Sequence, residues 1–381
     1  MIRTIGILGG GQLGRMLTLE AKRMGLRVVT LEPFPNSPTG QVADEQIVAA
    51  YDDLRAIGEL GARSDVVTYE FENIPLPSVL ALEADRRVVH PGSAALRITQ
   101  ERILEKTFVR ECGLETAEFV PVRSREELDR AASEIGFPGV LKTTLGGYDG
   151  KGQWVVRAPA DVARAWAEAK GRALIWERLI DFERELSIIA ARNEHGEIVA
   201  FPTSENQHDH GVLATTIVPG RIDAAIAERA RRAAVTIAER LAIVGTFCVE
   251  FFQHGDELLV NEIAPRVHNS GHYSLDATQI SQYELHVRAI CGLPLVEPRL
   301  FRPAVMVNIL GAGAGDTLGG LDVLLRERDL KLHLYGKAHA ALRRKMGHFT
   351  VLGETVDDAL AKAERGRRTL RWIDDRAAAL R

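Results

Sequence analysis

The chain has 381 residues, which is too long for one average domain and predicts two or three. It is 46% hydrophobic and 26% charged, as a soluble globular protein is, and its net charge of −4 provides no electrostatic footprint for nucleic acid. No apolar run approaches the roughly 20 residues that span a bilayer, and the chain opens into a strand rather than a signal peptide. The cysteines lie in apolar patterns without metal-ligand spacing, so we expect a cytoplasmic protein with reduced Cys112, Cys248 and Cys291.

Predicted strands and helices alternate in the N-terminal part. A strand at 5–8 leads into the run GGGQLG at 9–14 and a helix, and the next strand, 27–31, ends in Glu32. The run fits G-x-G-x-x-G, and the acid eighteen residues after Gly14 completes a dinucleotide fingerprint in its expected context. Physically, the pattern indicates only that backbone approaches an anion at a helix N-terminus, which a ribose phosphate satisfies as well as NAD.

A third buried strand, 66–69, ends in the two acids Glu70 and Glu72. The carboxyl ends of parallel strands form the ligand-binding edge of such a sheet, so these acids are candidate ligands. Ordinary solvation of a surface loop explains them equally well at this point.

The middle of the chain is predicted to form a small α+β unit. The segment 91–100 is interpreted as a junction, after which a helix starts near Thr99. Ser124 and Glu127 make a capping box that opens a second helix. Strands are predicted beyond it at 140–144, 153–157, 174–180 and 185–191, with a helix at 161–170.

Lys142 lies in the first of these strands and leads into a glycine-rich loop, 146–152, with four glycines in seven residues. The backbone N–H groups of such a loop can approach phosphates closely. The loop is not a Walker A motif, because it lacks the Gly-Lys-Ser/Thr ending. A glycine-rich hairpin tip without a ligand is the alternative.

Two apolar, β-prone runs, 248–252 and 258–263, are predicted to form a hairpin. If His254 pairs with Leu258 across a three-residue loop, Glu250 lies opposite Glu262 with the Cβ atoms roughly 5 Å apart. Opposed like charges are destabilising, and a hard divalent cation such as Mg²⁺ would compensate for them. A register slip of one residue would send the two side chains to opposite faces.

The loop at 264–272 follows the hairpin and is dense in hydrogen-bond donors, including Arg266 and two histidines. Such a loop beside two acids suits an anionic, hydroxyl-rich ligand such as a sugar phosphate. A solvated surface loop is the alternative. Later in the chain, 335–337 and 342–348 form a basic cluster, for which a solvated edge is the favoured interpretation on the residues alone.

The order of these features resembles the ATP-grasp superfamily and, within it, the N5-carboxyaminoimidazole ribonucleotide synthetases, which are ATP-dependent carboxylases of purine biosynthesis. The motifs that carry the resemblance spread over nearly the whole chain. They are GGGQLGRM at 9–16, YEFENIP at 69–75, GGYDGKGQW at 146–154, NEIAPRVHNSGH at 261–272 and RKMGH at 344–348.

The resemblance implies a mixed α/β and α+β fold of the ATP-grasp type. Its domains would be a Rossmann-like pre-ATP-grasp domain at 1–98, a central lid domain at 99–190 and a C-terminal domain at 191–381 that carries the metal hairpin and a small terminal subdomain. ATP would lie between the last two domains. The resemblance also implies a homodimer.

The resemblance implies ATP and Mg²⁺, or Mn²⁺, as cofactors, with Glu250 and Glu262 as the metal ligands. The nucleotide and its phosphates would contact residues matched motif by motif. These are Arg102, Lys142, Gly147, Tyr148, Asp149, Gly150, Lys151, Gly152, Gln153, Glu177, Arg178, Leu179, Ile180, Glu185, His208, Asn261 and Glu262.

The resemblance also implies a site for 5-aminoimidazole ribonucleotide, with Asp149, Arg266 and Lys337 as the catalytic residues and Asp149 as the acid–base group. Family members often carry Arg where this chain has Lys151, and lysine keeps the charge but not the bidentate fork. The residues matched to the ribonucleotide are Gly11, Gln12, Leu13, Glu72, Tyr148, Lys151, Arg266, His268, Asn269, Ser270, Lys337 and Arg344.

The implied reaction joins bicarbonate to the γ-phosphorus of ATP and then carboxylates the ribonucleotide amine, directly or through trapped CO₂. A nicotinamide dehydrogenase is a competing interpretation, although it leaves the acid pair and the second glycine loop unexplained. An ATP-grasp enzyme of different specificity, such as a formate-using glycinamide ribonucleotide transformylase, is a second competing interpretation. A non-catalytic nucleotide sensor is a third.

Overall fold

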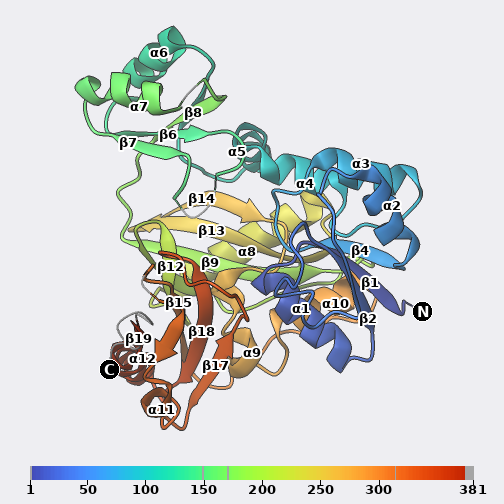
Figure 1. Ribbon diagram of the computed structural model, residues 1–381. Coiled ribbons are helices and arrows are strands. Elements are labelled where there is room, and N and C mark those ends of the chain that lie inside the picture. The colour runs from blue at the N-terminus through green and yellow to red at the C-terminus, as the bar shows by residue number, and fades with distance from the viewer. Residues whose placement is uncertain (1, 148–149, 170, 314, 374–381) are drawn as a thin grey trace.

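Figure 1 shows three units, each built on its own sheet. The computed structural model describes residues 2–147, 150–169, 171–313 and 315–373. None of the helices in these ranges has the length and apolar character needed to cross a membrane. A short pair of strands, β16 (Thr317–Gly319) and β19 (Arg371–Ile373), lies apart from the three sheets.

The N-terminal sheet is parallel, with its strands in the order β3, β2, β1, β4. Apolar cores cover both faces: Ile5 and Ile7 pack with α1 and α10, whereas Leu8 and Val29 pack with α2 and α3. Strands buried on both faces need near-continuous apolar runs, which made them predictable. The elements are β1 (Thr4–Leu8), α1 (Gln12–Arg23), β2 (Arg27–Leu31), β3 (Glu45–Ile47), α2 (Leu54–Ala62), β4 (Val66–Tyr69) and α3 (Leu76–Ala84).

The interpretation of 91–100 as a junction was wrong in its second part, which forms the helix α4 (Ser93–Gln100). This helix is followed at once by α5 (Arg102–Glu111). The extended backbone of Glu101 separates the two helices, and its carboxylate caps α5 by accepting hydrogen bonds from two backbone N–H groups. Pro91 and Gly92 suggested a loop, but α4 begins just after them.

The small sheet is antiparallel, in the order β5, β8, β6, β7, and projects at the upper left of Figure 1. Its helices α6 and α7 share one core with the sheet, centred on Leu141 and Trp176. Ser124 caps α6 as predicted, by accepting a hydrogen bond from the N–H of Glu127 at 3.2 Å. The elements are β5 (Phe119–Val122), α6 (Arg125–Ile135), β6 (Gly139–Thr143), β7 (Gln153–Val156), the 3₁₀ turn η1 (Pro159–Asp161), α7 (Val162–Ala169) and β8 (Leu174–Arg178).

Within the described residues, the third sheet has nine strands in the order β14-β13-β9-β11-β12-β15-β18-β17, with β10 added beside β9. One core joins it to α8 and another joins its opposite face to α10. The strands are β9 (Arg184–Arg192), β10 (Ile198–Ala200), β11 (Ser204–Asp209), β12 (Val212–Val218), β13 (Gly245–His254), β14 (Glu257–Ala264), β15 (Ala304–Leu310), β17 (Leu330–Leu334) and β18 (Lys345–Leu352). The helical segments are α8 (Ala224–Leu241), η2 (Asn269–Gly271), α9 (Ser274–Ala277), α10 (Gln282–Ile290), α11 (Leu321–Leu324) and α12 (Val356–Thr369).

The strand β9 pairs with β11 and β13 in this large sheet rather than with the small one. The central unit expected at 99–190 would have included it. The α5 helix likewise lies against the hairpin strand β14, because the N–H of Ile263 donates to Glu105 of α5. We therefore propose that the small unit begins after α5 and ends in the connection after β8.

The hairpin β13–β14 places Glu250 opposite Glu262, as predicted, but the turn and the pairing beside it differ from those expected. The expected pairing of His254 with Leu258 is wrong: His254 pairs with Glu257 across a two-residue turn. A bulge then shifts the register between Glu250 and Phe251, so that Asn261 is the extra residue. The shorter turn and the bulge together restore the opposition of the two acids.

The glycine run lies between β1 and α1 as predicted, but the anion at the helix N-terminus belongs to the chain itself. Glu70, at the end of β4, accepts hydrogen bonds from the N–H groups of Gly11 and Gly14, the latter at 2.7 Å. A Cβ on Gly9, whose φ is 121°, would lie 2.3 Å from the Glu70 side chain. Glu32, the acid that completes the dinucleotide fingerprint, accepts a hydrogen bond from the Tyr51 hydroxyl. These contacts occupy the groups that a dinucleotide would need.

Replacing Glu70 with alanine should leave two N–H groups without an acceptor in a buried place. Each such loss costs about 1–3 kcal/mol, so we expect urea unfolding to show a loss of about 2–6 kcal/mol. Formate should recover part of this loss in the Glu70→Ala variant, because the helix N-terminus still favours a small anion. The wild-type chain should not respond. If formate had no effect on the variant, Glu70 would not be serving as the internal anion.

Candidate functional site

A cavity of about 550 Å³ is lined by residues of all three units. Many of the predicted residues line it. They are Gln12, Leu13, Glu72, Arg102, Lys142, Gly147, Gly150, Lys151, Gln153, Glu185, His208, Glu250, Asn261, Glu262, Arg266, His268 and Asn269. The residues that sequence reasoning did not assign to a site are Phe71, Asn73, Gly211, Leu213, Phe252 and Lys345.

The bulged hairpin presents Glu250, Asn261 and Glu262 to this cavity together. Burial, followed by the charge of Glu262, raises the pKa of Glu250 to about 8. A guanidinium nitrogen of Arg102 lies 3.6 Å from a carboxylate oxygen of Glu262 and partly compensates for the like charges. Two carboxylates and a neighbouring amide oxygen are hard ligands that suit Mg²⁺ or Mn²⁺. The donor set therefore fits the divalent cation that the resemblance implies.

Sequence reasoning missed a buried acid behind this pair. Glu105 of α5 is 2% exposed and accepts a hydrogen bond of 2.6 Å from the N–H of Ile263. Burial and the charge of Glu262 raise the pKa of Glu105 to about 8. Its position three residues after Arg102 places both side chains on one side of the helix, a signal that could have found it.

Lys142 and Lys106 share one buried carboxylate. Their ammonium groups lie 2.8 Å and 3.4 Å from the same oxygen of Glu177. Burial acts to raise the pKa of Glu177, but the two lysines together outweigh burial and lower that pKa to about 2. The carboxylate is therefore charged and anchors both lysines. Lys142 also lines the cavity, so its ammonium group lies within reach of a ligand.

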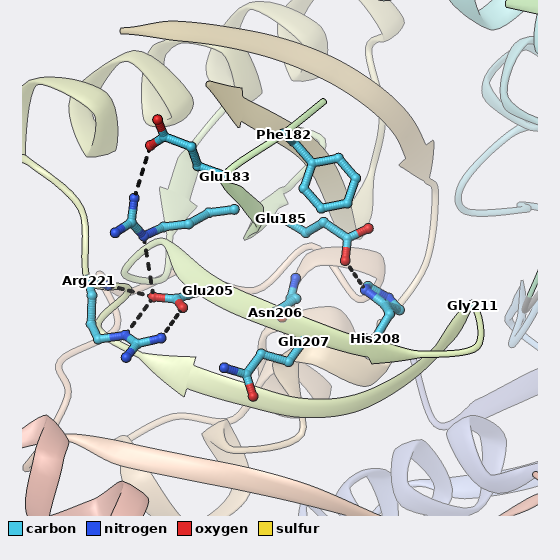
Figure 2. A pocket seen from close by; sticks show the side chains of 10 residues that line it. Phe182, Glu183, Glu185, Glu205, Asn206, Gln207, His208, Gly211 and Arg221 are labelled. Carbon is cyan, nitrogen blue, oxygen red and sulfur yellow. Dashed lines mark hydrogen bonds and ion pairs between the residues drawn. The ribbon is translucent and has the colours of Figure 1, made fainter. Parts of the chain in front are cut away.

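A wider, open hollow of about 900 Å³ adjoins the cavity and shares Glu185, His208 and Gly211 with it. Figure 2 shows the carboxylate of Glu185 turned toward His208, whose Nδ1 lies 2.6 Å away. Burial acts to lower the pKa of His208, but the hydrogen bond with Glu185 and the charges of Glu185 and Glu250 together outweigh burial and raise that pKa. Farther out, Arg221 pairs with Glu205. The hollow is open to solvent and adjoins the cavity, so it is suited to be the entrance. Among the described residues, none of the predicted catalytic groups lines it.

The donor-rich loop after β14 is held in place by buried partners. Arg266 donates to both carboxylate oxygens of Glu72, which brings the end of β4 to the hairpin. Burial raises the pKa of Glu72, and Arg266 lowers it by more. The Nδ1 atom of His268 lies 2.9 Å from the hydroxyl of Ser270, which is itself fully buried. Arg266 and His268 both line the cavity, so this predicted cluster is assembled.

Some predicted residues lie outside the cavity lining. Arg178 pairs with Glu118 on the exposed side of the small sheet. Among the described residues, those that line the cavity and the wider hollow do not include Arg178, Leu179 or Ile180. The full set of predicted residues outside the cavity lining is Gly11, Gly152, Glu177, Arg178, Leu179, Ile180, Ser270, Lys337 and Arg344. Tyr148 and Asp149 lie outside the described residues.

Lys337 nevertheless lies near the N-terminal unit rather than at a solvated edge. Its ammonium group donates to the carbonyl of Lys345 at 2.7 Å and lies 5.6 Å from the ring centroid of Tyr335. Its positive charge also lowers the pKa of Glu70, although burial leaves that pKa raised overall. Arg344 donates to the carbonyl of His339 at 3.0 Å.

Three family models match successive parts of the chain, and the second of them spans both the small sheet and part of the large one. The ribonucleotide synthetase preATP-grasp domain matches residues 2–100 and the ATP-grasp domain matches residues 107–283. The phosphoribosylaminoimidazole carboxylase C-terminal domain matches residues 304–362. The predicted ATP-grasp fold is thereby confirmed.

Individual relatives match over most of their length. The N5-carboxyaminoimidazole ribonucleotide synthase of Bacillus subtilis is 44% identical over 355 residues, covering 93% of this chain and 92% of that protein. The synthase of Brucella melitensis is 46% identical over 351 residues, with coverage of 91% and 95%. An Aspergillus clavatus N5-carboxyaminoimidazole synthase, solved with ADP and 5-aminoimidazole ribonucleotide, is 31% identical with a TM-score of 0.90 and coverage of 96% and 98%. The chain therefore belongs to the ATP-grasp superfamily and, within it, to the N5-carboxyaminoimidazole ribonucleotide synthase family of ATP-dependent ligases.

Proposed function

We propose that the chain uses ATP and bicarbonate to carboxylate 5-aminoimidazole ribonucleotide, giving N5-carboxyaminoimidazole ribonucleotide, ADP and phosphate in purine biosynthesis. The observation that carries the proposal is the shared cavity. It holds the acid pair Glu250 and Glu262 on one side and the donor cluster of Arg266 and His268 on another. A nucleotide phosphate and a sugar phosphate can therefore meet in one enclosed place.

Glu250 and Glu262 would hold Mg²⁺, with Asn261 beside them. When bound, the cation would neutralise phosphate charge. Arg102 and Lys142 supply fixed positive charge at the same wall, and Glu185 with His208 provides polar partners for the ribose at the entrance. Phe252 offers an apolar surface near this entrance and stacks on Phe182 at 4.7 Å.

The chemistry needs positioning more than covalent help from the protein. An oxygen of bicarbonate attacks the γ-phosphorus of ATP, the bond to the bridging oxygen breaks, and ADP leaves. The amine of the ribonucleotide then attacks the carbon of carboxyphosphate, phosphate leaves, and the amine proton passes to a base, for which Asp149 is the proposed group. Because carboxyphosphate hydrolyses easily, closure of the glycine loop 146–152 would protect it from water.

The assembly and location of the protein are part of the same proposal. We infer a homodimer in the cytoplasm, with the three units acting as pre-ATP-grasp, lid and catalytic domains. The confirmed family membership supports this inference.

Phosphate release should require every substrate of the proposed reaction. We expect release from ATP and Mg²⁺ to depend on both bicarbonate and 5-aminoimidazole ribonucleotide when each is omitted in turn. Formate with glycinamide ribonucleotide should not replace them, and NAD should not protect the protein against heat where Mg-ATP does. Equal phosphate release without the aminoimidazole ribonucleotide would refute the assignment.

Replacing Glu262 with glutamine should lower turnover by about 100-fold or more, a typical cost of losing a group that stabilises transition-state charge. The loss should persist at saturating Mg²⁺. Glu257→Gln, at the exposed turn of the same hairpin, is the matched control and should retain near-normal activity. Near-normal turnover of the Glu262 variant at limiting Mg²⁺ would exclude the acid pair as the metal site.

The same variant should change how stability depends on pH in metal-free protein. The folded-state pKa of Glu250 lies near 8, above its ordinary value of about 4.5. The protonation of Glu250 therefore contributes stability that is fully present below about pH 4.5, and this contribution is lost as the pH rises toward 8. Between about pH 5 and 8, the free energy of unfolding should fall in the wild type and fall less in Glu262→Gln.

Lys337→Met should raise the apparent Michaelis constant for the ribonucleotide by about ten- to a hundredfold. A charge-assisted contact to phosphate is worth roughly 1.5–3 kcal/mol, and 1.4 kcal/mol corresponds to a factor of ten. The constant for ATP should barely change, and neither constant should change in Lys331→Met, an exposed lysine on β17. If the Lys337 variant weakened both substrates equally, or neither, Lys337 would not belong to the ribonucleotide site.

A further inference from the structure

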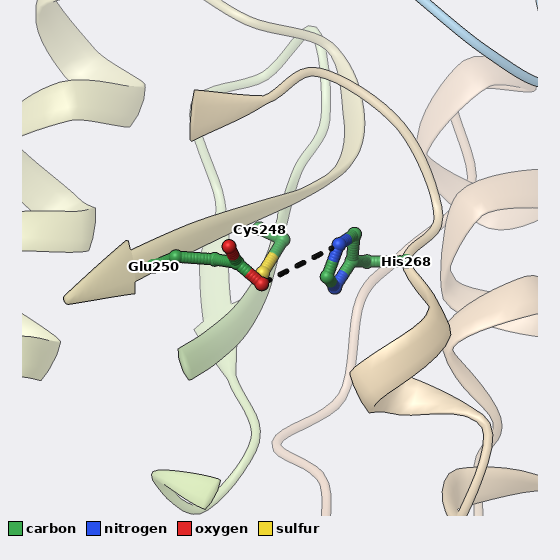
Figure 3. A group of neighbouring side chains, drawn as sticks. All are labelled: Cys248, Glu250 and His268. Carbon is green, nitrogen blue, oxygen red and sulfur yellow. Dashed lines mark ion pairs between the residues drawn. The ribbon is translucent and has the colours of Figure 1, made fainter. Parts of the chain in front are cut away.

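Three different metal-ligand types converge at one corner of the cavity. Atoms of Cys248, Glu250 and His268 that could bind a metal all lie within 4.8 Å of one another. Figure 3 shows the thiol of Cys248 next to the carboxylate of Glu250, with the imidazole of His268 facing both. Cys248 and Glu250 are two residues apart on β13 and therefore share a face, and His268 comes from the loop after β14.

We propose that Cys248, Glu250 and His268 form a binding site for Zn²⁺ or a chemically similar borderline-soft divalent cation. A thiolate, an imidazole and a carboxylate are the three ligand types that Zn²⁺ takes in proteins, and three protein ligands leave a fourth position open. Mg²⁺ prefers oxygen ligands and has little affinity for a thiolate. The site is therefore chemically distinct from the Glu250–Glu262 pair, although it shares Glu250.

The protonation state of His268 suits a metal ligand. Burial and the positive charge of Arg266 hold the pKa of His268 well below its ordinary value, so the ring is neutral. Its Nε2 atom faces Glu250 at 3.6 Å. Its Nδ1 atom accepts a hydrogen bond of 3.3 Å from the N–H of Ser270 and lies 2.9 Å from the Ser270 hydroxyl. Metal binding at Nε2 would move the ring proton to Nδ1, where that hydroxyl can accept it.

Ser270 also contacts the thiol. Its hydroxyl oxygen lies 3.9 Å from the Cys248 sulfur and accepts a hydrogen bond of 2.8 Å from Ser187. Asn206 in turn donates to Ser187 at 2.8 Å, so a buried chain of hydrogen bonds orients Ser270. With the metal in place, Ser270 accepts from the imidazole and donates to the thiolate. Outer partners of this kind orient the direct ligands of a metal.

Binding has a proton balance and a consequence. Cys248 enters as a neutral thiol, because burial holds its pKa well above the ordinary value, and Glu250 is largely protonated at neutral pH, because its pKa is about 8. Each must release its proton to solvent when it becomes a thiolate or carboxylate ligand. The bound ion withdraws Glu250 from the acid pair and covers the face of His268 toward the cavity. If the proposed function holds, Zn²⁺ therefore inhibits the enzyme in competition with Mg²⁺ and the ribonucleotide.

Cobalt(II) is the probe, because a thiolate ligand produces a charge-transfer absorption band that no oxygen or nitrogen ligand produces. The background variant Cys112→Ser/Cys291→Ser leaves Cys248 as the one thiol of the sequence. Titrating this variant with Co²⁺ should produce the band with one equivalent bound, and Zn²⁺ should abolish it. Absence of the band would overturn the proposal.

The other two ligands are tested in the same background. His268→Ala and Glu250→Gln should each raise the Co²⁺ concentration at half-saturation by about tenfold or more, as loss of metal-site groups does. His333→Ala removes an imidazole outside the cluster and should leave half-saturation unchanged. If neither ligand variant altered half-saturation, Cys248 would be binding the ion alone and the three-ligand site would be excluded.

An activity measurement separates this inference from the proposed function. Zn²⁺ inhibition of phosphate release, expressed relative to each protein's own uninhibited rate, should require about tenfold more Zn²⁺ in Cys248→Ser than in Cys291→Ser. Equal sensitivity of the two variants would overturn the inhibitory role. The Co²⁺ titration uses no substrate, so it can succeed or fail independently of whether phosphate release needs the ribonucleotide.

Discussion

The repulsion between two carboxylates on one face of a bulged hairpin governs the arrangement of the site. In the register set by the turn, Glu262 would lie opposite Val249, whose side chain belongs to the core beneath α8. The bulge at Asn261 turns Glu262 toward the cavity instead and adds an amide next to it. Placing both carboxylates there disfavours their full ionisation, which the raised pKa of Glu250 records. The surrounding charges have to compensate.

The compensating charges come from other elements, and this ties the three units together. Arg102 of α5 contacts Glu262, while Glu105 of the same helix accepts from the N–H of Ile263 on the hairpin. Lys142 reaches the same cavity from the small sheet and is anchored there by Glu177. In the proposed reaction, Arg102 can turn from Glu262 to a phosphate once the acid pair is neutralised. The positive groups thus offset the charge of the acids and are already positioned for an anionic ligand.

Local patterns predicted the buried strands β1, β2 and β4 and the capped helix α6, because buried strands and capped helices leave strong signals in sequence, whereas β3, α2 and α3 were not predicted. The opposition of Glu250 and Glu262 was predicted correctly from a turn that was one residue too long, because the bulge compensates for the shorter turn. Contacts between distant segments leave no comparable pattern in the sequence. Glu70 accepts a hydrogen bond from the N–H of Gly14, which lies 56 residues earlier. Cys248 and His268 come together because β14 runs antiparallel to β13. The ligand assignments rested on the family resemblance, since no spacing rule connects Lys142 with Glu177 or Arg266 with Glu72.

We propose that the bulged hairpin holds a divalent cation between its two acids. Anomalous diffraction from crystals grown with Mn²⁺ and ADP tests it most directly, because manganese scatters anomalously and replaces Mg²⁺ at oxygen sites. We expect one strong anomalous peak within about 2–2.5 Å of carboxylate oxygens of both Glu250 and Glu262. A strong peak elsewhere in the cavity, with neither carboxylate as a ligand, would contradict it.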